Sequence, residues 1–597
     1  MMTETCQPGR VATVSPEPVP VQFREALRIV QEKSSADLPS FQVLLACGFN
    51  PLHLQTFLQA HSQLRLAGRR VQVSTGLYGD LWGTLSRIEN SPPDACAVVL
   101  EWPDLDPRLG FRQLGGWGPK DLSDIVTGVE SKLGGLREVL SRTPRHLQVV
   151  LSFPSLPLPP VFPTPACQFS EAELRLQRAV DEFALWATGR PNFSVVNRQY
   201  LLRISPSTQR YDFKADLLTG VSYTLAHAER LGALLAQLLV PASPKKGLIT
   251  DLDGTLWSGI VGEVGAQAVT WDLASHTQVH GLYQQVLRAL AEQGVLIGVA
   301  SKNDPEIVEQ AFQRNDLLLS RQHVFPIEAH WSPKSESVAR ILHAWNVGPE
   351  SVVFVDDSPM ELAEVKDAFP EMECILFAAK DYAGVESTMY SLRDMFAKER
   401  ITQEDLVRQE SLKAADGVRK EDQQAAHSYE DFMRAAEAQV TLDFVSAATN
   451  PRSLELINKT NQFNLNGVRY TPSDWHNGLK PPDSFAMTTT YLDKYGPLGI
   501  IAVLKGHLNQ KTVSVDTWVM SCRAFARRIE YQCLRTLFEH FGADQIFFNF
   551  APTPRNQCLQ DFFAVFLGEK PIQPFTISFN VFQEKCPELY QKIEVKA

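Results

Sequence analysis

GLITDLDGT, residues 247–255, decides how the middle of this 597-residue chain folds. Its first four residues are predicted to form a short strand that runs directly into Asp251, Asp253 and Gly254. Two carboxylates at positions i and i+2 beyond a strand can face one crevice, and glycine lets the chain turn without a Cβ penalty. One carboxylate can then attack phosphorus while the other moves a proton. Because such a pair repels unless a divalent cation neutralises it, the stretch predicts Mg²⁺ with oxygen ligands.

Three later segments predict further groups at the same place. Residues 295–300 read as a second strand, and Ser301 follows it beside a predicted helix N-terminus, where hydroxyl and N–H groups hold phosphate. Lys334 lies in the first turn of another predicted helix, opposing its dipole, so we expect an anionic partner for it. A third strand, 352–355, ends in two more carboxylates, Asp356 and Asp357. Open α/β sheets bind ligands at the carboxyl ends of their strands, so these groups are expected to converge.

This order of residues resembles the four motifs of the haloacid dehalogenase superfamily. The resemblance implies that Asp251 is the nucleophile and that Asp253 is the acid and base and, through its backbone carbonyl, a metal ligand. Ser301 and Lys334 would hold the phosphoryl oxygens. The remaining matches are Thr255, which we place among the substrate-binding residues, and Asp356 and Asp357, which would ligate Mg²⁺ directly or through water.

A longer string narrows the resemblance. Residues 251–263, DLDGTLWSGIVGE, are similar to the FkbH-like branch, usually written DLDNTLWGGVVGEDG, and residues 456–465 and 520–523 also resemble it. The chain departs at Gly254, Ser258 and Val264, none of which is a catalytic side chain. The resemblance implies an enzyme of polyketide pathways. It would remove the phosphate groups of 1,3-bisphosphoglycerate, a small phosphorylated three-carbon acid, and load the glyceryl unit as a thioester on the phosphopantetheine arm of an acyl carrier protein.

Transfer to a carrier requires a thiol. Cys522 follows a predicted strand, 513–520, and precedes a predicted helix from about Phe525, whose N-terminus and Arg523 would lower the thiol pKa. A small buried residue at a strand end is the competing interpretation. Cys47 ends the first strand of the N-terminal region, where His53 or His227 could serve as base and core packing is again the alternative.

A polar cluster in the last region suits a hydroxylated substrate, although a hydrogen-bonded loop explains it equally: Asn458, Lys459, Asn461, Gln462 and Asn464. Arg523, Arg527 and Arg528 could attract the phosphate of a phosphopantetheine arm, or could form a solvated basic helix start. The region resembles an N-acetyltransferase (GNAT) fold. Ala526 and Arg528 replace both glycines of that fold's pyrophosphate motif, which puts binding of coenzyme A in doubt.

The chain as a whole is predicted to be a multidomain α/β protein. Over residues 39–240, strands and amphipathic helices alternate, as in a parallel sheet covered by helices. This region resembles an SGNH hydrolase fold. Only about 25 residues, 254–278, separate the aspartate motif from the next helix, so the phosphatase core has no room for a large cap domain. The expected regions are a flexible leader (1–38), an SGNH-like α/β domain (39–240), a capless haloacid dehalogenase core (247–380), a helical connector (394–430) and a GNAT-like α+β domain (431–590).

Composition limits the partners. A net charge of -11 argues against broad nucleic-acid binding, and no apolar run reaches the length of a membrane span. Nine cysteines without a CxxC pair suit a reducing compartment, so we expect a cytoplasmic protein. Two other functions remain open at this point: a plain magnesium phosphatase or phosphotransferase acting on another small acid, and a non-catalytic scaffold for synthase subunits. The clustered acids argue against the scaffold, because they destabilise a protein without their ion.

Overall fold

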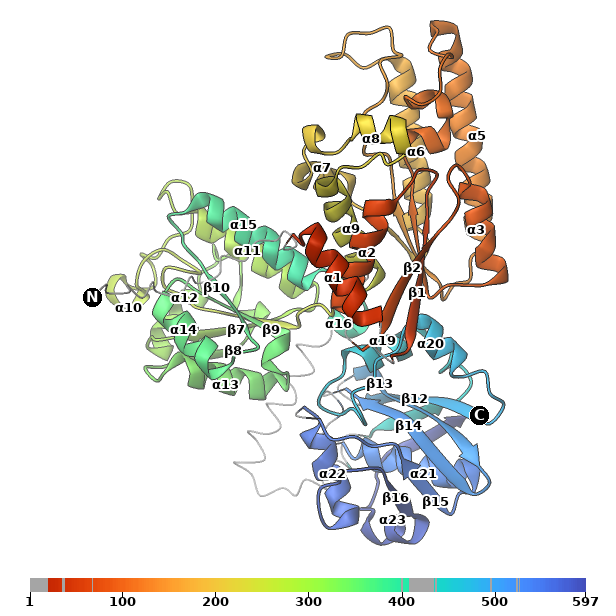
Figure 1. Ribbon diagram of the computed structural model, residues 1–597. Helices are drawn as coiled ribbons and strands as arrows, with labels where there is room; N and C mark the ends of the chain where they lie inside the picture. The colour runs from red at the N-terminus through yellow and green to blue at the C-terminus, as the bar shows by residue number, and fades with distance from the viewer. Residues whose placement is uncertain are drawn as a thin grey trace, which may run out of the picture. The chain divides into compact units, whose positions relative to one another are not determined.

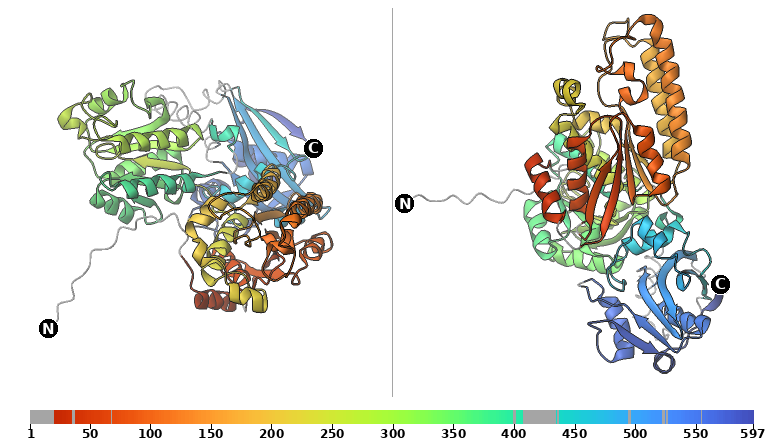
Figure 2. Two further views of the ribbon diagram at one scale, coloured as in Figure 1. Left: turned by 90° about the horizontal axis from the view of Figure 1, so that it is seen from above. Right: turned by 45° about the vertical axis from the view of Figure 1, so that its right-hand side comes forward.

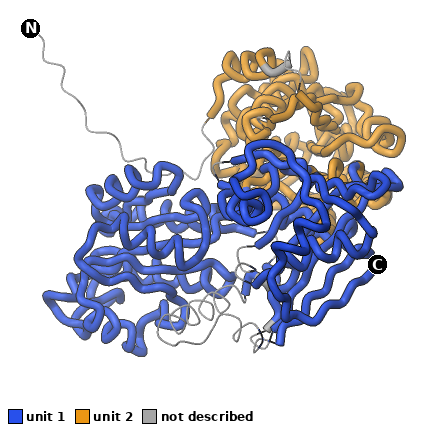
Figure 3. The backbone as a smooth tube through the Cα atoms, turned by 90° about the horizontal axis from the view of Figure 1, so that it is seen from below, with its two compact units in different colours: residues 1–16, 243–470, 478–597 blue, residues 17–242, 471–477 orange. Residues whose placement is uncertain are grey.

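The computed structural model describes residues 20–34, 38–66, 68–398, 401–406, 434, 437–493, 496–521, 524, 527–553 and 555–597. The chain divides into two compact units, one containing residues 243–470 and 478–597 and the other residues 17–242 and 471–477 (Figure 3). Three sheets organise the described residues. Within this part of the chain, no helix combines the length and the apolar character that crossing a membrane requires.

A five-stranded parallel sheet forms the centre of the second unit (Figures 1 and 2). Its strands, in spatial order, are β2 (Arg70–Thr75), β1 (Ser40–Ala46), β3 (Ala95–Val99), β4 (Gln148–Ser152) and β5 (Phe193–Val195). One face packs on α1 (Phe23–Ser34), α2 (Leu52–Arg65) and α9 (Leu225–Leu239). The other packs on α3 (Leu81–Asn90), α4 (Trp102–Leu105), α5 (Leu122–Ser141) and α6 (Glu171–Thr188), while α7 (Arg198–Ile204) and α8 (Phe213–Thr219) follow β5. The predicted alternation of strands and covering helices is confirmed.

The predicted flexible leader is wrong from residue 23 onward. Residues 23–34 form α1, which packs against α2, and Ala26 is fully buried in the same core as the first strand. The apolar residues of α1 recur at helical spacing, so the helix has one face to bury. Residues 1–19 lie outside the described part of the chain.

The middle of the chain forms a second parallel sheet, in the order β10 (Glu373–Leu376), β9 (Val352–Asp356), β6 (Gly247–Thr250), β7 (Leu296–Ser301) and β8 (Val324–Ala329). Helices α11 (Gln278–Glu292), α12 (Pro305–Phe312) and α15 (Tyr382–Phe396) cover one face, and α13 (Lys334–Trp345) and α14 (Pro359–Ala368) cover the other (Figure 1). In central β6, Leu248 packs in the core on the side of α11, α12 and α15, and Ile249 packs in the core on the side of α13 and α14. Burial on both faces explains why this strand is apolar throughout its middle.

The connections of this domain are short. Between β6 and α11 the described residues add only the single turn α10 (Val261–Val264), and between β7 and β8 they add α12. This arrangement agrees with the expected absence of a cap. The predicted connector, 394–430, begins inside α15, which ends at Phe396, and includes the short helix α16 (Gln403–Leu406). Residues 407–433 lie outside the described part of the chain.

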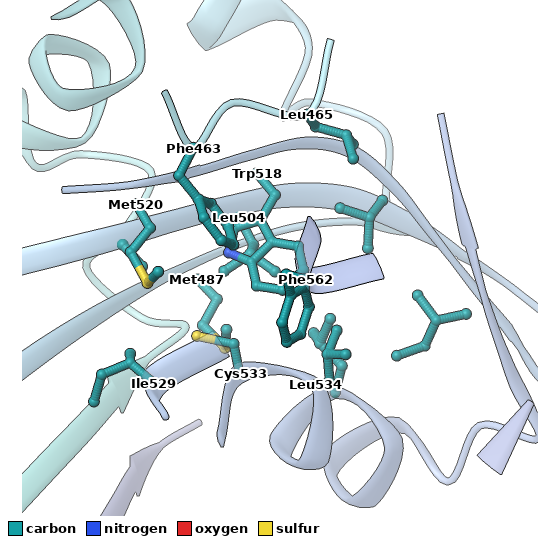
Figure 4. Packing of buried hydrophobic residues seen from close by; sticks show 14 of the residues in the cluster. Phe463, Leu465, Met487, Leu504, Trp518, Met520, Ile529, Cys533, Leu534 and Phe562 are labelled. Carbon is teal, nitrogen blue, oxygen red and sulfur yellow. The ribbon is translucent and has the colours of Figure 1, made fainter. Parts of the chain in front are cut away.

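The last region contains a seven-stranded mixed sheet. Its order is β16 (Phe575–Ser578), β15 (Gln545–Phe548), β14 (Thr512–Met520), β13 (Gly496–Asn509), β12 (Ser484–Asp493), β11 (Gln439–Asp443) and β17 (Lys592–Lys596). The pairs β14–β15 and β11–β17 are parallel and the others antiparallel. Helices α21 (Ile529–Phe541), α22 (Gln557–Leu567) and α23 (Phe579–Lys585) contribute to a core around Trp518, part of which Figure 4 shows. Helices α19 (Pro451–Lys459) and α20 (Pro472–Asn477) precede β12. The α+β order is confirmed, whereas the GNAT-like topology stays a prediction.

One helix of this region begins later than predicted. We expected a helix from about Phe525, but α21 begins at Ile529. Arg528, the residue before it, has a φ of 56°, in the left-handed region, so the helical backbone cannot extend through it.

Candidate active site

The backbone of the middle sheet brings two of the predicted aspartates together. Thr250 of β6 pairs with Val355 of β9, and the N–H of Asp251 donates to the carbonyl of Val355 at 2.9 Å. Asp251 therefore follows β6 at the level at which Asp356 ends β9. Both side chains are buried, at the carboxyl end of the sheet.

Lys334 connects these carboxylates. Its Nζ lies 2.7 Å from Oδ1 of Asp251, 2.7 Å from Oδ2 of Asp356 and 2.9 Å from Oε2 of Glu361. The lysine is 1% exposed. Burial alone would lower its pKa, but Asp251, Asp356 and Glu361 together raise that pKa above its usual value, so Lys334 is charged. Lys334 was expected to have an anionic partner, and it pairs with three carboxylates.

The acidic cluster fits a divalent cation. Ligand atoms of Asp251, Asp356 and Asp357 lie within 4.8 Å of one another. Burial, and then the charge of Asp251, raise the pKa of Asp356 to about 7 and that of Asp357 to about 6. Burial also raises the pKa of Asp251, against the opposing effect of Lys334. These carboxylates therefore carry more negative charge than one lysine balances, and oxygen ligands of this kind suit Mg²⁺.

Asp253 lies apart from that cluster and is held by three donors. Its Oδ1 accepts from the indole Nε1 of Trp257 at 2.7 Å and from the N–H of Val261 at 3.0 Å, and its Oδ2 accepts from Nδ2 of Asn303 at 2.9 Å. These three hydrogen bonds fix the orientation of the Asp253 side chain, and its role as acid and base stays a prediction. Its predicted contact with metal through the backbone carbonyl stays a prediction.

Ser301 ends β7, as expected, and is buried beside these groups. The same Asn303 amide that bonds to Asp253 also donates to the Ser301 hydroxyl at 2.9 Å. Thr255 is fully buried, and within the described structure its hydroxyl has no hydrogen-bond partner. The sheet therefore gathers all seven residues of the predicted phosphate site into one domain.

Sequence reasoning missed two residues of this site. Asn303 stands two positions after Ser301, and Glu361 stands in the first turn of α14 after Ser358 and Pro359. The available signal was an amide or a carboxylate soon after a strand that ends in a predicted site residue. Many solvent-exposed loops have the same pattern.

Comparison with solved structures agrees with this core. The N-terminal part of a protein from Bacteroides fragilis, which contains a phosphatase domain and was crystallised with Mg, is similar over 64% of this chain and 100% of its own length, with 19% identity and a TM-score of 0.52. The two chains share a fold. No protein-family description matches this chain, and no curated protein does.

Two other similarities are too slight to support an argument. An extracellular lipase from Streptomyces rimosus matches 34% of this chain and 99% of its own, with 14% identity and a TM-score of 0.23. An uncharacterised protein from Corynebacterium glutamicum matches 26% and 98%, with 20% identity and a TM-score of 0.19. The SGNH-like character of the N-terminal domain therefore stays a prediction beyond its parallel α/β sheet.

Cys47 does not have the surroundings of a nucleophile. Its thiol is buried and donates to the carbonyl of Phe49 at 3.4 Å. Burial, and then the charge of Asp104, raise the pKa of Cys47 well above its usual value, which disfavours the thiolate. His227 bonds instead to the hydroxyls of Ser155 and Ser205, at 2.9 and 2.8 Å, and His53 packs edge-on against Phe23. These contacts favour core packing at Cys47. Cys522 and Arg523 lie outside the described residues.

The polar cluster of the last region is largely used within its own loop. Asn458 exchanges two hydrogen bonds with the backbone of Tyr470, Asn464 donates to the carbonyl of Thr460, and Lys459 pairs with Glu455. In the same unit, a cavity of about 80 Å³ is lined by Lys459, Asn461 and Gln462 together with Lys246 and Glu350, which precede β6 and β9. That cavity lies at the amino ends of the strands, opposite Asp251. The structure does not bring this cluster to the phosphate site, and its role in binding substrate stays a prediction.

Proposed function

We propose that this chain is a magnesium-dependent phosphatase of the haloacid dehalogenase type, with Asp251 as the nucleophile. One observation supports the proposal above all: a single buried lysine, Lys334, holds Asp251 and Asp356 at equal distances of 2.7 Å, with Asp357 beside them. A buried cluster of this charge is costly unless a cation and an anionic substrate complete it. The fold shared with a phosphatase-containing protein adds to this support.

In this mechanism a carboxylate oxygen of Asp251 attacks phosphorus, and the bond to the leaving oxygen breaks. Lys334 and the Ser301 hydroxyl hold the phosphoryl oxygens as negative charge develops on them. Asp253 gives a proton to the leaving oxygen and then takes one from the water that hydrolyses the aspartyl-phosphate. Asp251, Asp356 and Asp357 would hold Mg²⁺, which when bound neutralises the charge that otherwise keeps a phosphate dianion out.

The first test measures phosphate release from p-nitrophenyl phosphate with and without Mg²⁺. We expect Asp251→Asn to lower kcat by at least ~10³-fold, because the neutral amide of asparagine is too weak a nucleophile to form the aspartyl-phosphate. Asp104→Asn is a matched control, since Asp104 is also a carboxyl group whose pKa is raised by burial but it lies in the other unit. Intact-protein mass spectrometry at low pH should detect a phosphoryl adduct on the wild type and none on Asp251→Asn. Phosphate release by Asp251→Asn at the wild-type rate would refute the proposal.

We further propose that the substrate is 1,3-bisphosphoglycerate and that the glyceryl unit passes as a thioester to the phosphopantetheine thiol of an acyl carrier protein. The resemblance of residues 251–263, 456–465 and 520–523 to the FkbH-like branch supports this finer proposal. The acyl phosphate is already activated, so the thiolate displaces phosphate and the thioester forms without a further energy source. Cys522 is our candidate for an acyl-enzyme thiol.

Incubation with bisphosphoglycerate, Mg²⁺ and a pantetheinylated carrier protein, followed by mass spectrometry, tests the transfer. A glyceryl adduct on the carrier is expected with the wild type, and loss of an enzyme-bound adduct is expected with Cys522→Ser. Cys586→Ser is a suitable control, because Cys586 is a partly buried thiol of the same region. Phosphate release without any carrier adduct would leave a plain phosphatase.

A further inference from the structure

A second lysine stands at the edge of the phosphate site. Lys302 follows Ser301 directly, so the end of β7 fixes its backbone beside the phosphoryl-binding hydroxyl. Its Nζ lies 2.9 Å from Oε1 of Glu361. The other oxygen of the same carboxylate, Oε2, binds Lys334 at 2.9 Å. Glu361 thus holds two ammonium groups at once, one facing Asp251 and one at the edge of the site.

The two lysines differ in side-chain exposure and in the number of carboxylates that each contacts. The side chain of Lys334 is 2% exposed and has three carboxylate partners. The side chain of Lys302 is 33% exposed, and among the described residues Glu361 is the carboxylate that pairs with it. An ammonium group has three N–H bonds, so Lys302 can donate to a ligand without leaving Glu361. Lys334 is buried and already serves the phosphoryl group in the proposed mechanism, so it does not lie at the edge of the site.

The negative charge around the site leaves Lys302 as a favourable place for a second anionic group of a substrate. Asp251, Asp356 and Glu361 contact Lys334, Glu361 also contacts Lys302, and Asp357 lies beside Asp251 and Asp356 in the described structure. Even with a divalent cation bound, a second anionic group on a substrate would meet repulsion at most points around the phosphate. Beside Lys302 it would meet attraction, because Coulomb energies between charges in contact are large at partly buried positions.

We propose that Lys302 is a specificity-determining residue, which binds a second anionic group, a carboxylate or phosphate, carried a few atoms from the phosphoryl group that Asp251 attacks. This inference rests on the proposed phosphatase function and names its substrate class as phosphorylated acids. Glu361 acts as a positioning residue, which orients Lys302 toward the ligand and Lys334 toward Asp251.

Two esters separate this role from a general one. 3-Phosphoglycerate and glycerol 3-phosphate carry the same phosphate ester and differ in one carboxylate. With Lys302→Met we expect KM for 3-phosphoglycerate to rise about tenfold with kcat unchanged, as for loss of one charge-assisted hydrogen bond, and KM for glycerol 3-phosphate to change less than about twofold. Lys302→Arg should restore most of the discrimination, because it keeps the charge.

Arg288→Met is the matched control. Arg288 pairs with Glu292 on the surface of α11 at 2.8 Å, so the variant removes one charge and one ion pair from the same domain. It should leave both KM values unchanged. An equal loss on both esters in Lys302→Met, or no loss on either, would overturn the proposal.

Binding gives a readout that does not depend on turnover. Calorimetric titration of the Asp251→Asn variant with each ester should show tighter binding of 3-phosphoglycerate, and Lys302→Met added to that variant should remove the difference. Equal affinities before that addition would sink the assignment of Lys302. Failure of the phosphatase function itself would appear elsewhere, as p-nitrophenyl phosphate hydrolysis that does not depend on Asp251.

Discussion

At Gly254 the backbone turn and the acidic cluster occupy adjoining space. The residue has a φ of 74°, in the left-handed region that favours glycine. A Cβ placed there would lie 2.3 Å from Oδ2 of Asp357. A side chain at this position would therefore force the exposed carboxylate of Asp357 to shift, which changes its distance from Asp251 and Asp356.

Gly254→Ala should therefore weaken the binding of Mg²⁺ more than it lowers the stability of the fold. We expect about 1–2 kcal/mol lower stability from the left-handed backbone and about a tenfold higher Mg²⁺ concentration for half-maximal activity. Gly265→Ala is the control, because Gly265 has a φ of 85° with no atom within 4 Å of the added Cβ. Urea unfolding and Mg²⁺ titration of activity measure the two effects. Equal Mg²⁺ dependence in the two variants would contradict this explanation.

Lys334 also matters for stability. Lys334→Met would leave Asp251, Asp356 and Glu361 close together without their cation, which should lower the free energy of unfolding by about 3–5 kcal/mol near pH 8. The loss should shrink toward pH 5, because protonation relieves the repulsion. Chemical unfolding at the two pH values tests this, and a loss independent of pH would count against it.

At the level of the element, the carboxyl end of β9 couples proton binding to stability. The folded pKa values of Asp356 and Asp357, about 7 and about 6, lie above the ordinary value of 3.8. A carboxyl group whose pKa is raised by folding stabilises the fold while protonated, and this stabilisation is lost as pH rises from about 4 through 7. Without metal, Asp356 and Asp357 should thus make the chain less stable at pH 8 than at pH 5.

Mg²⁺ should reverse that trend, because it replaces the protons that leave. We expect Mg²⁺ to raise the Tm at pH 8 and to have little effect at pH 5, since metal and protons compete for the same oxygens. Asp357→Asn should reduce the rise. Differential scanning calorimetry with and without Mg²⁺ provides the measurement, and a larger Mg²⁺ effect at pH 5 than at pH 8 would contradict the sign.

Sequence reasoning found the central strands of this sheet and missed its edges. β6, β7 and β9 are buried on both faces, so their apolar runs stand out. β8 has four half-exposed residues in its middle and contains Pro326, and in β10 only Ile375 is buried. Neither has the periodicity by which a strand is recognised. Asp251 and Asp356 could be predicted because each follows such a run, whereas Glu361 enters the site only through the packing of α14 against α13.

At the level of the whole molecule, the proposed chemistry is contained in one domain. Among the described residues, the charged groups that contact Lys334 and Asp251 lie within residues 251–361, and this domain has its own cores on both faces of its sheet. The last described helix of the domain, α16, is attached to it by the ion pair of Lys398 with Asp405 at 2.9 Å. The flanking regions therefore contribute none of the described groups at the phosphate site.

A fragment of residues 243–406 should accordingly fold and hydrolyse p-nitrophenyl phosphate with a kcat within about threefold of the full chain, a barrier change below ~1 kcal/mol. It should transfer no glyceryl group to a carrier, because Cys522 is absent. Circular dichroism checks folding before activity is measured. A folded but inactive fragment would show that a neighbouring domain completes the site.

The hydrogen bond from the Asp251 N–H to the Val355 carbonyl has a practical consequence for redesign. The pairing of β6 with β9 sets the spacing between Asp251 and Asp356, so exchanging loops at the carboxyl end of the sheet would leave that spacing unchanged. New segments grafted between β7 and α12, or ahead of α14, should therefore alter substrate choice, while the pairing of β6 with β9 keeps Asp251 and Asp356 in place.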